Sequence, residues 1–130
     1  MIRLLYISTA TRDMDEADLA AIGEVANRRN ARDGITGLLC FNGRNFMQLI
    51  EGERAAIDAL MAKLQDDDRH SGIVVMHDQL AGERAFPNWS MRVAFVSADD
   101  ATRLGEMEEL LPATLDADLR DIMLGYGSLR

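Results

Sequence analysis

Residues 35–53 read ITGLLCFNGRNFMQLIEGE, and they consist of two apolar runs joined at Asn42-Gly43. An Asn-Gly pair between two such runs is a strong signal for a tight β-hairpin turn. We therefore predict two adjacent antiparallel strands, one over residues 35–41 and one over residues 45–51. Gly52 ends the second strand.

A single glutamine interrupts the apolar character of this second strand. Side chains alternate between the two faces of a strand, so Gln48 shares a face with Phe46 and Ile50. A buried amide without a hydrogen-bond partner costs roughly 1–3 kcal/mol. The strand therefore predicts that a polar group from elsewhere in the chain meets Gln48.

Patterns on either side of the hairpin complete a β-α-β-β-α-β order. Asp15 is a suitable N-cap for the first helix, and Gly34 closes that helix. The other predicted elements are a strand at 2–8, a first helix ending near Asn30, a second helix from Glu53 to the polar run DDDRH at 66–70, and strands at 73–80 and 91–95. This order predicts an α+β, ferredoxin-like fold with an additional fifth strand, in which a mixed sheet carries two helices on one face.

The C-terminal residues predict a helical appendage. We expect residues 1–97 to form the main domain and residues 98–130 to form an extension packed on it. Two short helices, over about 99–111 and 116–124, are separated by Pro112, which cannot continue a helix interior. The two helices share an apolar stripe, which is predicted to pack on the second face of the sheet, or to meet a partner protein or a second copy of the chain. The stripe comprises Leu104, Met107, Leu110, Leu111, Leu119, Ile122 and Met123.

Composition restricts the partners and the cellular compartment. A chain of 130 residues, 48% hydrophobic and 28% charged, is sufficient for one ordinary globular domain. Its net charge of −8 and pI near 4.6 disfavour nucleic acid and anionic membrane surfaces. Cys40 is the only cysteine, and we find no signal peptide and no apolar run long enough to span a membrane. We therefore expect a cytoplasmic protein.

The predicted topology supplies a partner for Gln48. In a ferredoxin-like sheet the first and third strands lie side by side in the centre, beneath both helices. Tyr6 lies on an apolar face of the first strand, so it can reach Gln48 there. A phenol hydroxyl is a natural hydrogen-bond partner for a buried amide.

Five segments, in this order, resemble the BLUF family of flavin-binding blue-light sensors. They are LLYIS with Tyr6, RRNARDGITGLL with Asn30, NFMQLIEGE with Gln48, DDDRH with Asp67, Arg69 and His70, and NWSM with Trp89 and Met91. The resemblance extends from about Ile2 to Val96. It implies a bound flavin, FAD or alternatively FMN, and a sensor without enzymatic activity that signals to a separate downstream protein.

The resemblance also assigns roles to individual residues. It implies that the flavin ring lies between the two helices, that Asn30 contacts its pyrimidine edge, and that Gln48 bridges the flavin and Tyr6. The other positions implied to contact the cofactor are Ile22, Phe46 and Leu64 along the ring, Asp67, Arg69 and His70 at its rim, and Arg29 and Lys63 at the phosphate.

The resemblance further implies a light-driven transfer of an electron and a proton from Tyr6, after which Gln48 rotates or tautomerises. The hydrogen-bond network then differs, with no covalent bond to the cofactor. Either Trp89 or Met91 is implied to approach Gln48, and the resemblance leaves this choice open.

Simpler interpretations exist for each residue. Tyr6 and Gln48 could be an ordinary satisfied core pair, Asn30 a helix terminus, and DDDRH a solvated helix end. His70 and His77 have no further ligands at metal spacing, which disfavours a zinc or iron site, and Cys40 fits a small core residue. Two other functions remain open: a regulatory domain that binds a small metabolite, and, less favoured, a phosphate-ester hydrolase that uses the loop STATR.

Overall fold

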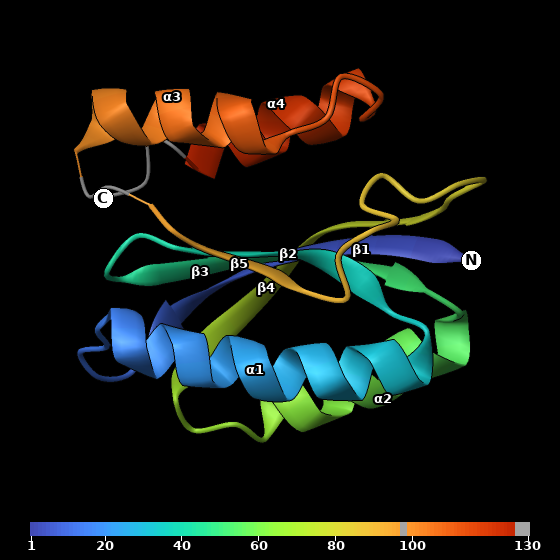
Figure 1. Cartoon of the computed structure of the whole chain (residues 1–130), viewed down its shortest axis with the longest axis horizontal. Coiled ribbons are helices and arrows are strands. Elements are labelled where there is room, and N and C mark those ends of the chain that lie inside the picture. The colour runs from blue at the N-terminus through green and yellow to red at the C-terminus, as the bar shows by residue number, and fades with distance from the viewer. Residues whose placement is uncertain (97–98, 127–130) are drawn as a thin grey trace.

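The computed structural model describes residues 1–96 and 99–126, and in them a five-stranded mixed sheet lies between two helical layers (Figure 1). The strand order is β4-β1-β3-β2-β5. The elements are β1 (Ile2–Ala10), α1 (Glu16–Asp33), β2 (Thr36–Phe41), β3 (Asn45–Gly52), α2 (Arg54–Gln65), β4 (His70–Leu80), β5 (Arg92–Phe95), α3 (Asp100–Leu110) and α4 (Ala117–Gly125). The predicted α+β, ferredoxin-like architecture with a fifth strand is confirmed.

The Asn42-Gly43 hairpin forms as predicted and connects β2 to β3. Gly43 has a φ of 95°, a conformation that residues with a Cβ rarely adopt. The Asn42 side chain accepts hydrogen bonds from the backbone N–H groups of Arg44 and Asn45, at 3.0 and 2.8 Å. The turn therefore fixes the antiparallel pairing in which Leu39 lies opposite Gln48.

Both ends of α1 follow from local chemistry. Asp15 accepts the backbone N–H of Asp18, while the Asp18 side chain accepts the backbone N–H of Asp15, which makes a reciprocal capping box. At the other end Gly34 adopts a left-handed conformation, with φ 71° and ψ 27°. The helix extends to Asp33, three residues beyond the predicted end near Asn30.

Of the two predicted boundaries around the run DDDRH, the end of the second helix is confirmed and the start of the fourth strand was wrong. Helix α2 ends at Gln65, and β4 begins at His70 instead of residue 73. The strand begins early because β1 continues to Ala10, which pairs with His70, while the N–H of Thr11 donates to the carbonyl of Arg69. The segment therefore leads into an edge strand, where polar side chains can remain in contact with water.

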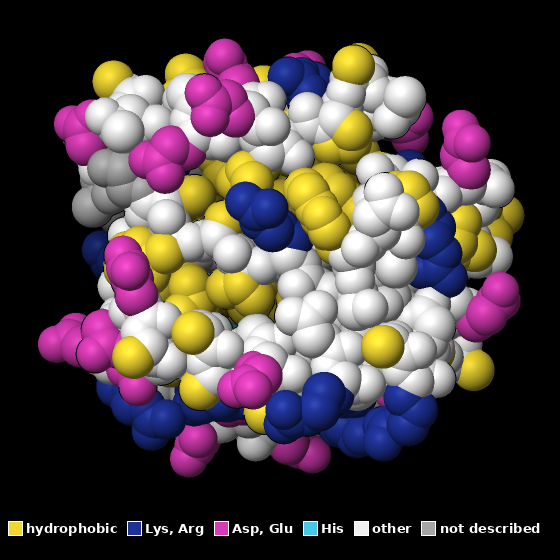
Figure 2. Space-filling model, in the orientation of Figure 1, with side chains coloured by type: hydrophobic (Ala, Val, Ile, Leu, Met, Phe, Trp, Pro, Cys, Tyr) yellow, Lys and Arg dark blue, Asp and Glu magenta, His cyan; other side chains and the backbone are white. Residues whose placement is uncertain are grey.

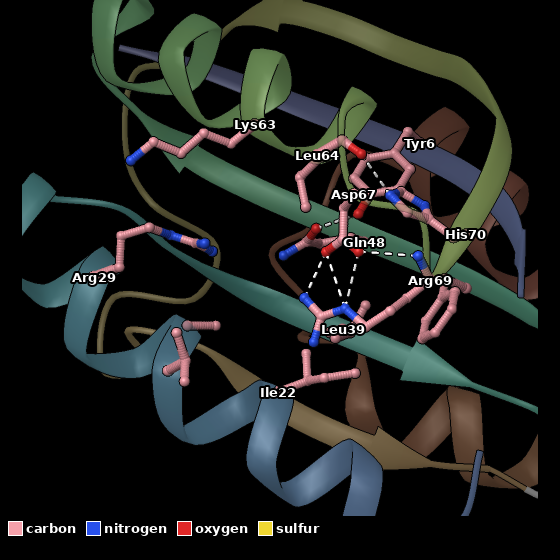
Figure 3. Close-up of a pocket in the computed structure, with 13 residues that line it drawn as sticks. Tyr6, Ile22, Arg29, Leu39, Gln48, Lys63, Leu64, Asp67, Arg69 and His70 are labelled. Atoms are coloured by element: carbon pink, nitrogen blue, oxygen red, sulfur yellow. Dashed lines mark hydrogen bonds and ion pairs between the residues drawn. The ribbon is translucent and has the colours of Figure 1, made fainter.

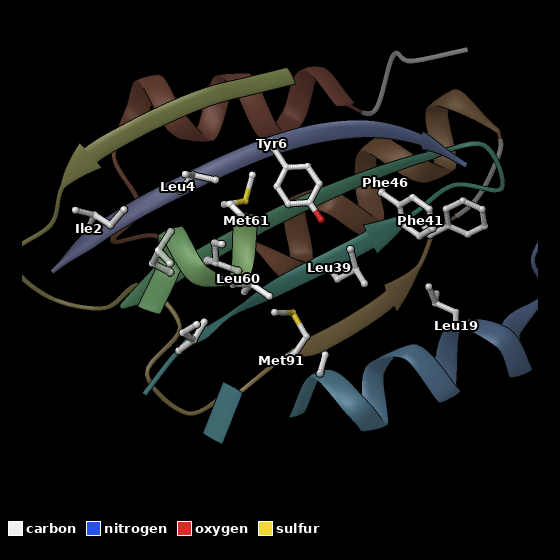
Figure 4. Packing of buried hydrophobic residues seen from close by; sticks show 14 of the residues in the cluster. Ile2, Leu4, Tyr6, Leu19, Leu39, Phe41, Phe46, Leu60, Met61 and Met91 are labelled. Carbon is white, nitrogen blue, oxygen red and sulfur yellow. The ribbon is translucent and has the colours of Figure 1, made fainter. Parts of the chain in front are cut away.

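The sheet separates two apolar clusters. Helices α1 and α2 cover one cluster, which contains Tyr6 and Met91 (Figure 4), and α3 and α4 cover the other. As predicted, Met107, Leu111, Leu119 and Met123 of the C-terminal stripe are buried against the second face, with Leu110 and Ile122 partly buried there.

Leu104 departs from this predicted stripe. Its side chain is 40% exposed, whereas the neighbouring Arg103 is 1% exposed. At this turn of α3 the buried position is therefore 103 instead of 104, while Met107 and Leu111 of the stripe remain buried. Among the described residues, no helix is long and apolar enough to cross a membrane.

The close approach of β2 to β3 generates a stability prediction. A Cβ placed on Gly37 would lie 1.9 Å from the carbonyl oxygen of Leu49, which is backbone and cannot move aside. Gly37→Ala should therefore lower the free energy of unfolding by about 2–4 kcal/mol in urea titrations.

Gly105 provides the matched control, since a Cβ there meets no atom within 4 Å. Gly105→Ala, within α3, should raise the free energy of unfolding by about 1 kcal/mol. Equal effects of the two substitutions would contradict the close approach at Gly37.

Candidate functional site

A pocket of about 160 Å³ lies between α1 and α2, against the sheet (Figure 3). Its apolar lining comes from both helices and from β2 and β3. The lining residues are Tyr6, Ile22, Val25, Ala26, Arg29, Leu39, Phe46, Gln48, Lys63, Leu64, Asp67, Arg69 and His70. All the residues that the sequence placed at a cofactor, except Asn30, line this one pocket.

Tyr6 and Gln48 form the buried polar centre of the site. They are direct cross-strand partners in the antiparallel register of β1 and β3. The Tyr6 hydroxyl donates to Oε1 of Gln48 at 2.5 Å, and both side chains are almost completely buried. Burial raises the pKa of Tyr6 well above that of an ordinary phenol, so the hydroxyl keeps its proton at neutral pH.

The other end of the Gln48 amide meets Met91. Nε2 of Gln48 donates to Sδ of Met91 at 3.6 Å, and Met91 lies in the same apolar cluster as Tyr6. A thioether is a weak acceptor, so this bond is the weaker of the two. Met91 lies one residue before β5 and not inside it as predicted.

Trp89 lies on the other side of the sheet. Its ring stacks on Phe86 with centroids 5.3 Å apart, and the Arg92 guanidinium lies 5.2 Å from its centroid. Trp89 packs against the cluster beneath α3 and α4. Of the two residues that the sequence left open, Met91 contacts Gln48 in this structure and Trp89 packs in the other cluster.

Asp67, Arg69 and His70 form a hydrogen-bonded rim at one end of the pocket. Nε and Nη2 of Arg69 donate to the Asp67 carboxylate, which lowers the pKa of Asp67 to about 2. His70 contacts Ser8 Oγ through Nδ1 and the carbonyl of Leu64 through Nε2, each at 2.7 Å. In the described part of the chain, no group of three His, Cys, Asp or Glu residues is arranged to hold a metal ion.

Arg29 and Lys63 lie at the other end of the pocket, on α1 and α2 respectively (Figure 3). Partial burial lowers the pKa of Arg29. Lys and Arg side chains gather over these two helices on the face shown in Figure 2, although the protein as a whole is acidic. This end of the pocket is therefore suited to an anionic group.

Asn30 does not line the pocket. Its side chain is fully buried, and Nδ2 donates to the carbonyl of Ser90 at 3.0 Å. The nearby Asn27 accepts the backbone N–H of Met91 at 2.8 Å. In this structure the two asparagines of α1 hold the segment that carries Met91, a role that the sequence did not indicate.

Leu39, Val25 and Ala26 are pocket residues that the sequence reasoning missed. A signal for each was present. Leu39 is the cross-strand neighbour of Gln48 on β2, and Val25 and Ala26 follow Ile22 at helical spacing. The predicted contacts of Gln48 and Ile22 with the cofactor could therefore have been extended to these three neighbours.

The side chains that line the pocket fit a flavin. Apolar side chains from α1, α2 and the sheet can cover a planar ring, and the Gln48 amide with the Asp67–Arg69 pair offers both donors and acceptors at its edge. Arg29 and Lys63 supply positive charge at the other end of the pocket, which suits an anionic group.

These features define a small α+β domain with a pocket between two helices and the sheet. Residues 1–92 match the family BLUF, described as sensors of blue-light using FAD. The chain belongs to the BLUF family, which confirms the resemblance seen in the sequence, and it is a flavin-binding blue-light sensor.

Three relatives illustrate the similarity. Over 92 residues the chain is 42% identical to photoactivated adenylate cyclase subunit beta of Euglena longa, covering 70% of this chain but 11% of that protein. The BLUF protein BlrB in its dark state has a TM-score of 0.75 and 32% identity, covering 98% and 93% of the two chains. Klebsiella pneumoniae BlrP1 with FMN and cyclic diGMP has a TM-score of 0.78 and 29% identity, covering 98% and 35%.

The Asp67–Arg69 pair generates a prediction about pH. The folded pKa of Asp67 is lower than the unfolded value near 3.9, so its ionised form stabilises the folded state. This contribution is complete above roughly pH 5 and disappears as the pH falls toward 2. The difference in free energy of unfolding between the wild type and Asp67→Asn should therefore shrink with acidification in urea titrations.

Arg69→Gln tests the cause of the same shift. Without the guanidinium, the pKa of the Asp67 carboxyl, followed by NMR titration, should rise toward its ordinary value. An unchanged titration of Asp67 in this variant would contradict the assignment.

Proposed function

We propose that the described pocket binds FAD, with FMN as the alternative, and that Tyr6, Gln48 and Met91 form the light-responsive switch of this sensor. The observation that supports the proposal is the continuous buried line from the Tyr6 hydroxyl through the Gln48 amide to the Met91 sulfur. A bound flavin supplies a strong one-electron oxidant when it absorbs blue light.

The chain's own residues then determine the response. Loss of an electron from Tyr6 acidifies its hydroxyl, and the proton moves along the existing hydrogen bond to Oε1 of Gln48. Gln48 rotates or tautomerises, which exchanges its donor and acceptor ends with little change in volume. The electron and the proton return to Tyr6, and an altered hydrogen-bond pattern remains.

The unequal partners of Gln48 favour such a switch. Its oxygen is held at 2.5 Å by Tyr6, whereas its nitrogen is held at 3.6 Å by a weak sulfur acceptor. Reorienting the amide therefore sacrifices only one strong hydrogen bond, the one that light perturbs. A carboxylate in place of Gln48 would instead bring a buried charge.

The output is proposed to be a protein–protein signal. The chain spans 11% of the length of the photoactivated cyclase subunit that it resembles but 93% of BlrB. We propose that residues 1–97 are the sensor, that residues 98–130 are an extension packed on it, and that the signal reaches a separate cytoplasmic partner, with no enzymatic activity in this segment. Self-association of the chain is an alternative output.

The absorption spectrum tests the proposal. After flavin reconstitution, the purified protein should be yellow and should show a reversible red shift of its visible bands under blue light. A colourless preparation would instead favour the metabolite-binding alternative and would overturn the proposed function.

Two substitutions test the assigned roles. Tyr6→Phe removes the hydroxyl, and Gln48→Leu removes the amide, while both retain an apolar side chain of similar size. Each should abolish the red shift without preventing flavin binding. A normal red shift in either variant would contradict its assigned role.

The phosphate contact generates a prediction about cofactor affinity. Arg29→Ala should weaken FMN binding about fivefold, the effect of removing one partly exposed charge pair, and leave riboflavin binding unchanged. Fluorescence titration would measure both affinities. Arg28→Ala, which alters a neighbouring exposed residue paired with Glu24, should affect neither.

A further inference from the structure

Glu51 is a buried charge that the light-responsive switch does not use directly. Its side chain is fully buried, and the carboxylate accepts three hydrogen bonds: from Arg3 Nε at 2.9 Å and from the backbone N–H groups of Ala85 and Phe86 at 2.8 and 2.9 Å. A buried carboxylate is tolerated only when such donors replace its lost hydration. Glu51 therefore fixes residues 85 and 86 in one position.

The segment that Glu51 holds is the connection between β4 and β5, residues 81–91. Further bonds hold its first half: Arg3 Nη2 donates to the carbonyl of Glu83 at 2.9 Å, and Arg84 donates to the carbonyls of Glu51 and Gly34 at 2.9 and 2.7 Å. The first half of the connection is thus attached to β1 and β3 through charged groups.

The second half of the same connection reaches the switch. The N–H of Gly37 donates to the carbonyl of Trp89 at 3.0 Å, and Asn27 and Asn30 hold residues 90 and 91. Met91 then contacts Gln48. One connection therefore touches β3 twice, at Glu51 on one face of the strand and at Gln48 on the other.

The two contacts are mechanically linked because only four residues separate Phe86 from Met91. The Phe86 ring stacks on Trp89, so the backbone bond from Phe86 to Glu51 also sets the position of the Trp89 ring. Pro87 lies within this short bridge and restricts its backbone. The path along the backbone from residues 85–86 to Met91 is therefore short.

We propose that Glu51, held by Arg3, is a positioning residue that sets the contact between Met91 and Gln48 and thereby the lifetime of the light-induced state. This inference rests on the proposed function of Gln48. Arg3 Nη1 also lies 3.7 Å from the carboxylate of Asp116, the N-cap residue of α4, so the same guanidinium contacts the C-terminal helical layer.

A double-mutant cycle on the flavin-loaded protein tests the proposal. Glu51→Gln preserves the shape of the side chain but replaces one carboxylate oxygen with an NH₂ group. This group cannot accept a hydrogen bond from the backbone N–H groups of residues 85 and 86, so the connection is held less firmly. Met91→Leu conserves volume and removes the sulfur acceptor. The measured quantity is the rate of thermal return from the red-shifted state in the dark.

We expect Glu51→Gln to change the return rate about five- to tenfold in the wild-type background and to leave it unchanged in the Met91→Leu background, because the effect passes through Met91. The same factor in both backgrounds, or no change in either, would overturn the proposal. If the wild type itself shows no red shift, the proposed function fails as well, so the two failures are distinguishable.

Two further variants separate positioning from general destabilisation. Asp78→Asn removes the ion pair with Arg54 on the exposed side of α2, and it should leave the return rate unchanged. Arg3→Lys keeps the charge beside Glu51 but loses the branched donor, and it should give an intermediate change in rate. If the Glu51→Gln protein does not fold, Arg3→Lys takes its place in the double-mutant cycle with Met91→Leu.

Discussion

The antiparallel register between β1 and β3 is the constraint on which the site depends. It places Tyr6 directly opposite Gln48, so that the two side chains bond within one face of the sheet. A slip by one residue would turn Gln48 to the other face, beneath α3 and α4. The tight turn at Asn42-Gly43 and the close backbone approach at Gly37 fix the neighbouring register between β2 and β3. The chemistry of the site is thus determined by strand pairing before any cofactor is considered.

Local patterns were sufficient to predict most of this arrangement. The Asn-Gly turn, the capping residue Asp15 and the closing Gly34 each act within a few residues, and each lies where the sequence indicates. The meeting of Tyr6 and Gln48 is a long-range contact, but it follows from the topology once the order of elements is known. The cost of an unpaired buried amide made that contact predictable.

The features that escaped prediction depend on partners without a pattern. The sequence assigned no role to Glu51 or Arg103, and charged side chains are seldom fully buried unless they are paired. The partners of Glu51 include backbone groups in an irregular connection more than thirty residues away, which no periodicity indicates. Asn30 was assigned to the cofactor by resemblance, whereas its amide holds Ser90 in this structure.

The position of Met91 and Trp89 on opposite sides of the sheet bears on how a signal can leave the buried pocket. No polar side chain needs to pass through the sheet, because the backbone of residues 89–91 passes around its edge. Met91 ends that segment against Gln48, and Trp89 begins it in a cavity that Leu110 and Pro112 also line, at the end of α3. Two peptide bonds therefore connect the residue that contacts Gln48 to the residue that packs beneath the C-terminal helices. Hydrogen bonds with Gly37, Asn30 and Asn27 hold residues 89, 90 and 91 in this path.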